Sequence, residues 1–181
     1  MEIFKKVALA GLCLVCTSQL AHAQIRDAGS KIRDEAVSGH EVQTYQSHAQ
    51  DQSQILYYYS QSQKPIPKAE AKELVTGIRK NLAASGTPLA KIKAVHAKEP
   101  DVMKQIALIE KHHAKAQEVC GMAEEHCLKE HGDHVVIGNC CSEMWHELDA
   151  AQAETKKLLK MLKIEKLEAP KKVSAKADVA K

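Results

Sequence analysis

The longest regular pattern of the chain lies in residues 101–131, which read DVMKQIALIEKHHAKAQEVCGMAEEHCLKEH. Small and apolar side chains recur there at alternating spacings of three and four residues, which puts them on one face of a helix. These positions are Val102, Ile106, Ile109, His113, Ala116, Cys120, Ala123 and Cys127. We therefore predict one long helix over 101–131 whose stripe of small and apolar residues faces a core.

A second long helix is expected on the C-terminal side of this segment. The sequence GDHVVIGN at 132–139 is bracketed by glycines and indicates a turn. Helical spacing resumes over 140–164, and the side chains expected to face inward are Cys141, Met144 or Trp145, Leu148, Ala151, Thr155, Leu158 and Leu162. The Lys- and Ala-rich tail at 167–181 has the composition of a disordered segment.

Shorter helices are expected on the N-terminal side. A helix over 45–63, with Tyr45 and His48 on its inward stripe, ends at two prolines in the segment KPIP. The next helix is expected over 68–85. Gly86 followed by Thr87-Pro88 is typical of one helix ending and another starting.

The fold class that follows from these patterns is all-α. We predict one domain over residues 45–166, either an antiparallel four-helix bundle or a long helical hairpin packed on shorter helices. Aromatic residues make up only 3% of the chain, so the core must consist of Leu, Ile, Val, Met and Ala. Such a core suits helices better than a β-sandwich.

The beginning of the chain is typical of a secretory signal. Two lysines precede the apolar run 7–15, and small residues flank the predicted cleavage site near Ala23. We therefore predict a signal peptide at 1–23, a flexible lead-in at 24–44, and a secreted or periplasmic protein. The apolar run is too short to span a membrane. The net charge of +3, with interleaved signs, argues against a nucleic-acid partner.

Residues 112–146 hold four of the six cysteines and six of the ten histidines of the chain. Thiolates, imidazoles and thioethers are ligands for Cu(I) or Zn(II). In general plan this stretch resembles the helical-bundle copper-binding proteins of bacterial envelopes. Copper-storage bundles line their cores with many cysteines, so the resemblance implies at most a single site here.

A hairpin that turns near residue 135 would bring these ligands together. Cys127 would lie level with Met144, and His131 level with Cys140. The predicted metal ligands are Cys127, His131, Cys140, Cys141, Met144 and, from the turn, His134.

Cys120 is expected two turns further along the same stripe, level with Leu148 and too far away to join this set. It is either an ordinary buried thiol or part of a second metal site with His113 and Glu124. We place the buried thiol first.

The alternative to a metal site is a disulfide that joins Cys127 to Cys140 or Cys141. Such a bond near the turn would stabilise the fold by roughly 3 kcal/mol. The protein would then be a structural or interaction protein whose surface binds another envelope protein. No CxxCH motif is present, so covalent haem c is not expected. No substrate pocket is indicated either, and we do not expect an enzyme.

Overall fold

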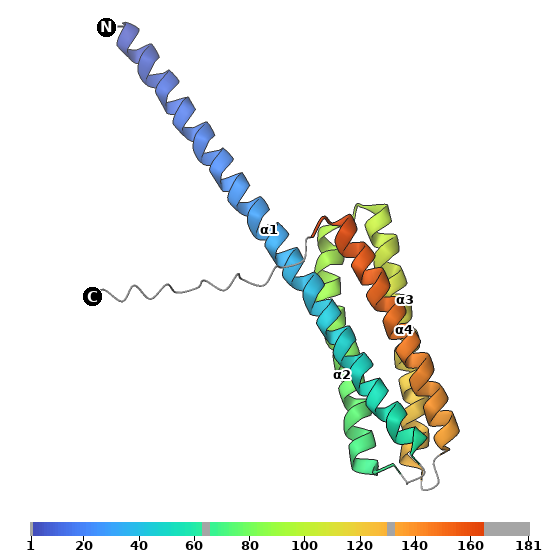
Figure 1. Ribbon diagram of the computed structural model, residues 1–181. Helices are drawn as coiled ribbons and strands as arrows, with labels where there is room; N and C mark the ends of the chain where they lie inside the picture. Colours follow the sequence, from blue (N-terminus) through green and yellow to red (C-terminus); the bar gives the residue numbers. More distant parts are fainter. Residues whose placement is uncertain (1, 63–65, 130–132, 165–181) are drawn as a thin grey trace, which may run out of the picture.

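The computed structural model describes residues 2–62, 66–129 and 133–164 and places nearly all of them in helices (Figure 1). The four helices are α1 (Glu2–Gln61), α2 (Lys68–Val95), α3 (Pro100–Leu128) and α4 (His134–Met161). These described ranges contain no β-strand. The predicted all-α class is therefore confirmed.

The helices form a ring in which each packs against its two neighbours. Helix α1 contacts α2 and α4, and α3 contacts the same two helices from the opposite side. Four to six residues separate one helix from the next, so successive helices run antiparallel (Figure 1). The antiparallel four-helix bundle is confirmed. In the part of the chain that the structure describes, no helix combines the length and the apolar character needed to cross a membrane.

Helix α1 is longer than the sequence indicated. It includes residues 24–44, where a flexible lead-in was predicted, and Val42 in this segment is fully buried in the core. Its N-terminal part projects beyond the other three helices (Figure 1). The buried face of α1 includes Val42, Gln46, Ala49, Ser53 and Leu56.

The inward stripe predicted for this helix was placed one residue too early. Tyr45 is only half-buried and His48 is exposed, whereas Gln46 and Ala49 are fully buried. The inward positions of α1 hold small or polar residues in addition to large apolar ones. Hydrophobic spacing alone therefore did not identify the buried face.

Helix α2 runs without interruption through Gly86 and Pro88, where the sequence indicated an end and a restart. No described glycine has a positive φ, so Gly86 does not adopt the left-handed conformation of a helix C-cap. Pro88 has no N–H and removes one hydrogen bond from the helix. It is buried on the same face as Ser85 and Leu89, and packing against the neighbouring helices holds α2 together across the proline.

Helix α4 begins at His134, six residues before the predicted start at Cys140. Asp133 is its N-cap. The Oδ1 atom of Asp133 accepts hydrogen bonds from the backbone N–H groups of Val135, at 2.9 Å, and Val136, at 3.2 Å. These bonds satisfy two of the donors that the first turn of a helix leaves unpaired.

Gly138, in the first part of α4, does not form a turn; it allows α4 to pack closely against α1. A Cβ atom at Gly138 would lie 2.9 Å from the Oγ atom of Ser60, so glycine permits the close approach of α4 to α1. Ile137 beside it is buried. The turn predicted over 132–139 is therefore wrong from His134 onward.

Asp133→Ala is expected to lower the free energy of unfolding by about 1 kcal/mol, because two backbone donors lose their acceptor. Urea denaturation followed by circular dichroism measures this change. Asp133→Asn keeps a capping oxygen and should lose much less. Asp149→Ala, on the exposed face of the same helix, is the matched control. A loss for Asp133→Ala no larger than that of the control would contradict the capping role.

The core contains two hydrophobic clusters that follow one another along the bundle. The cluster near the α3–α4 connection draws on residues within 49–56, 71–82, 116–127 and 137–148. The other lies nearer the opposite end and includes Val42, Leu89, Ile92, Val102, Ile106, Ile109 and Leu158. All eight residues of the stripe predicted for the long helix over 101–131 are buried, which confirms the stripe; the helix itself ends at Leu128, and residues 130 and 131 lie outside the described ranges.

Candidate functional site

Two side-chain contacts determine the register of α3 against α4. The amide Nε2 of Gln105 donates to the carbonyl oxygen of Glu154 at 2.9 Å. The Nδ1 atom of His112 lies 2.6 Å from Oε2 of Glu147. Seven residues separate the two contact positions on each helix, so the register stays constant over this length.

This register places Cys120 level with Asn139, directly beside the two adjacent cysteines of α4, Cys140 and Cys141. The predicted register is therefore wrong, both in setting Cys127 level with Met144 and in setting Cys120 level with Leu148. The error arose at the turn. Because α4 starts six residues earlier than predicted, every level across the hairpin moves toward the N-terminus of α4.

Helices α3 and α4 bring four cysteines into one region of the core. We call Cys120, Cys127, Cys140 and Cys141 the cysteine cluster. All four are buried, with exposed fractions between 0% and 7%, and all belong to the same hydrophobic cluster. All four are free thiols, so the structure contains neither of the disulfides considered above. Met144, which is fully buried, adds a thioether to this region.

The thiols of the cysteine cluster are close enough to affect one another's ionisation. Burial raises the pKa of Cys120 and of Cys127 to about 11. Burial also raises the pKa of Cys141, and the other three thiols add to this effect. The pKa of Cys140 is raised by burial and by the carboxylate of Glu143. The cluster is therefore fully protonated at neutral pH, which makes the free thiols poor nucleophiles.

Of the two histidines predicted as ligands, the structure describes only His134. His131 lies outside the described residues. His134 is at the start of α4, and its Nδ1 atom lies 3.2 Å from the backbone carbonyl oxygen of Ser60 at the end of α1. This hydrogen bond occupies Nδ1, so only the other ring nitrogen of His134 could serve a metal ion while the bond is kept.

The three residues of the predicted second site have separate surroundings. The Sγ atom of Cys120 lies 3.9 Å from the carbonyl oxygen of Val75, within the cysteine cluster. Glu124 forms an ion pair of 2.8 Å with Arg79 nearer the surface. His113 lies two turns away along α3 and bonds to other helices, as described below. The structure does not bring these side chains together.

The arrangement of ligand atoms limits which metal ions the bundle could hold. Among the described residues, no group of three or more His, Cys, Asp or Glu side chains is placed to hold one ion. A structural zinc site needs four protein ligands. Two thiols of the cysteine cluster would instead suit an ion of low coordination number.

A second buried constellation has one polar residue from each helix. Gln46, Ser85, His113 and Thr155, here called the polar layer, lie between the two hydrophobic clusters and are at most 8% exposed. The Nε2 atom of Gln46 lies 2.9 Å from Nε2 of His113 and donates to Oγ1 of Thr155 at 3.0 Å. Ser85 Oγ lies 3.4 Å from the other ring nitrogen of His113.

The hydrogen bonds of the polar layer define one protonation state of His113. Ser85 donates its own hydrogen to the carbonyl oxygen of Leu82 at 2.7 Å, so it accepts from Nδ1–H of His113. Nε2 of His113 then accepts from Gln46. The imidazole is therefore neutral. Burial lowers the pKa of His113 to about 4, with a further contribution from His112.

Sequence reasoning placed two members of this layer, His113 and Thr155, on inward stripes but did not recognise the layer. Gln46 is polar and belongs to the stripe that was misplaced by one residue. Ser85 is the last residue of the helix predicted over 68–85, so its burial inside α2 was not expected. The available signal was a polar residue at an inward position on each of the four helices.

The chain was compared with known protein families, with curated proteins and with solved structures, and it matches none of them. Its fold is that of an antiparallel four-helix bundle.

Proposed function

We propose that this protein is exported and binds Cu(I) through the thiolates of Cys127 and Cys141. The observation that supports the proposal best is the burial of four free thiols and the Met144 thioether in one cluster built by two helices. Soft sulfur ligands favour Cu(I) over harder ions. Cu(I) is stable with two thiolates in a linear arrangement, whereas a structural zinc site takes four protein ligands.

Within the cysteine cluster we prefer Cys127 and Cys141 because of the coupling between their thiols, although the register sets Cys120, not Cys127, beside the adjacent cysteines of α4. They come from different helices, so one ion would join α3 to α4. Among the neighbouring thiols, Cys127 has the largest effect in raising the pKa of Cys141. Cys120 and Met144 supply further sulfur atoms beside the pair.

A nearby cation offsets the negative charge that the complex would carry. Two thiolates and one Cu(I) ion carry a net charge of −1, because the ion replaces two protons. The guanidinium of Arg79 acts on the same region, since its positive charge opposes the effect of burial on the pKa of Cys120. A nearby cation lowers the cost of a buried anion.

The proposal of export rests on the first 23 residues, whose basic start, apolar run and small residues suit a cleavable signal. In an oxidising compartment a disulfide between Cys127 and Cys140 or Cys141 competes with copper for the same thiols. The two uses of these thiols predict different masses for the isolated protein.

Intact mass spectrometry of the exported protein, under native and then denaturing conditions, tests the proposal. We expect cleavage near Ala23, one copper ion in the native spectrum, and fully reduced cysteines after denaturation. Cys127→Ser and Cys141→Ser should each abolish stoichiometric Cu(I) binding. Cys140→Ser is the matched control, because Cys140 is the most exposed thiol of the cluster, and it should retain binding.

Two results would overturn the proposal. Retention of Cu(I) by both Cys127→Ser and Cys141→Ser would exclude this pair as ligands. A native mass without copper, combined with a denatured mass reduced by a disulfide, would instead support a structural or interaction protein with a bonded hairpin. Circular dichroism of each metal-free variant separates loss of ligands from loss of fold.

A further inference from the structure

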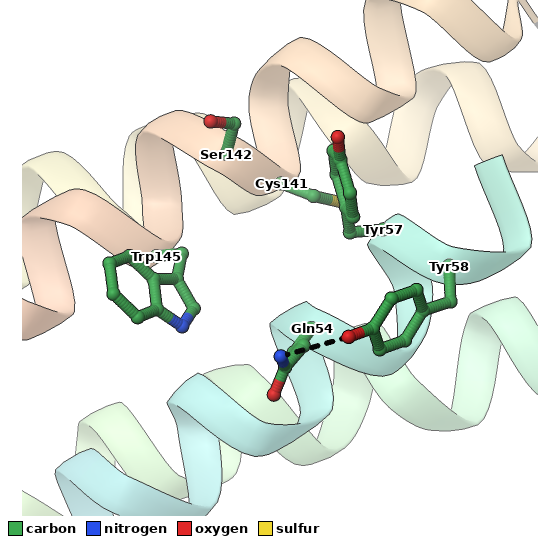
Figure 2. Close-up of a pocket in the computed structure, with 6 residues that line it drawn as sticks. All are labelled: Gln54, Tyr57, Tyr58, Cys141, Ser142 and Trp145. Carbon is green, nitrogen blue, oxygen red and sulfur yellow. Dashed lines mark hydrogen bonds between the residues drawn. The ribbon is translucent and has the colours of Figure 1, made fainter. Parts of the chain in front are cut away.

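A pocket of about 190 Å³ opens between α1 and α4 (Figure 2). Helix α1 contributes Gln54, Tyr57 and Tyr58, and α4 contributes Cys141, Ser142 and Trp145. The pocket borders the cysteine cluster at Cys141, but the copper proposal does not use its other residues. The pocket opens on the surface of the bundle and shares only Cys141 with the proposed copper site.

Aromatic side chains are concentrated at this pocket. The whole chain has one Trp, four Tyr and one Phe, and half of these aromatic residues line the pocket. They are also exposed, Tyr58 to 62% and both Tyr57 and Trp145 to 36%. Their rings surround the pocket from several sides (Figure 2). Exposed apolar groups that gather around a hollow mark binding sites more often than scattered ones do.

The polar groups of the pocket define the chemistry of a ligand. The Nε2 atom of Gln54 donates to the hydroxyl oxygen of Tyr58 at 3.2 Å, which leaves the hydroxyl hydrogen of Tyr58 to point elsewhere. The indole N–H of Trp145 is a second donor in the wall (Figure 2). None of the six lining residues carries a charge at neutral pH. The pocket therefore suits an uncharged ligand with a hydrogen-bond acceptor.

The volume of the pocket limits the size of that ligand. An apolar cavity of about 150 Å³ holds one benzene molecule. We propose that the pocket between α1 and α4 binds an uncharged aromatic molecule of one or two rings that carries a hydroxyl or carbonyl group. The rings stack against Tyr57, Tyr58 and Trp145, and the oxygen accepts from Tyr58 or Trp145. This proposal stands independently of copper binding.

The indole N–H signal of Trp145 in a proton–nitrogen NMR spectrum tests the proposal directly. The chain has a single tryptophan, so this signal needs no assignment and reports on the pocket alone. p-Cresol is the test ligand. We expect a saturable shift with a dissociation constant on the order of 1 mM, as suits a molecule of this size. 4-Methylcyclohexanol, which has a similar outline without an aromatic ring, should bind much more weakly.

Tyr58→Ala should weaken p-cresol binding by about tenfold, because it removes one aromatic wall and one donor. Tyr58 is largely exposed, so this variant should fold normally. Tyr45→Ala, on the same helix but outside the pocket, is the matched control and should bind like the unmodified protein. An indole signal that does not shift, equal binding of 4-methylcyclohexanol, or unchanged binding by Tyr58→Ala would each overturn the proposal.

Discussion

Acidification from neutral pH to pH 4 is expected to lower the free energy of unfolding by about 3 kcal/mol through His113 alone. The imidazole of His113 is neutral in the polar layer, where it accepts a hydrogen bond from Gln46 and donates one toward Ser85. A proton on the accepting nitrogen would turn a donor toward the amide of Gln46. It would also place a positive charge in a site that is almost fully buried.

The direction of this effect follows from the two pKa values. Burial lowers the pKa of His113 from 6.5 to about 4 in the folded protein; His112 lowers it further and Glu110 opposes the shift. Between pH 6.5 and about 4, His113 is protonated in the unfolded chain and neutral in the folded protein. The contribution of His113 to stability is therefore complete above pH 6.5, decreases as the pH falls, and is lost at about pH 4.

Chemical denaturation at a series of pH values measures this dependence. Other groups also contribute in acid, because hydrogen bonds from Lys129 and Lys157 lower the pKa values of Glu125 and Glu154. The informative quantity is therefore the difference between the unmodified protein and His113→Gln, whose amide does not titrate. We expect His113→Gln to be less stable at neutral pH and to have a much flatter profile between pH 6.5 and 4.

His48→Gln is the matched control, since His48 is exposed on α1 and its replacement should leave the profile unchanged. Parallel profiles for the unmodified protein and His113→Gln would show that His113 does not titrate as the structure requires.

The apparent affinity for Cu(I) is expected to rise by about 100-fold for each pH unit, if the proposed function is correct. Each thiol must lose its proton when it becomes a ligand. Burial raises the pKa of Cys127 to about 11 and raises that of Cys141 as well, so both thiols are protonated throughout the neutral range. Two protons therefore leave for each ion that binds.

Competition with a chromogenic Cu(I) chelator at several pH values measures this slope. Exposed thiols, with pKa values near 8.5, would show a slope that declines above that pH, whereas the buried pair should keep the full slope beyond it. A tenfold change per pH unit would indicate a single thiolate, with Met144 as the other ligand, and would contradict the proposed pair. Cys140→Ser should have the same slope as the unmodified protein.

Much of the fold could be predicted from the chain because α3 carries a long, uninterrupted stripe of small and apolar residues. The ends of the helices were less predictable. Gly86 and Pro88 are ordinary signals for a helix end, yet packing against neighbouring helices carries α2 through both of them. Gly138 has the residue type of a turn, but it lies inside α4, where the absence of a Cβ atom allows the close approach of Ser60.

The candidate site was predictable in its residue types and only in part in its geometry. The sequence identified Cys127, Cys140 and Cys141 as neighbours across a hairpin, and these thiols do affect one another's pKa values. The sequence alone excluded Cys120 from this group. The predicted register of α3 against α4 was wrong by several residues, and this error placed Cys120 opposite the wrong part of α4. The start of α4 at His134 corrects that register and adds Cys120 to the cluster.

The sequence by itself determined the all-α class, the buried face of α3, and the concentration of soft ligands in one segment. These features follow from local spacing and composition, which do not depend on the rest of the molecule. Only the tertiary structure decided the register of α3 against α4, the polar layer, and the aromatic pocket between α1 and α4. Each of these depends on how residues distant in the sequence pack against one another, and local periodicity carries no information about that packing.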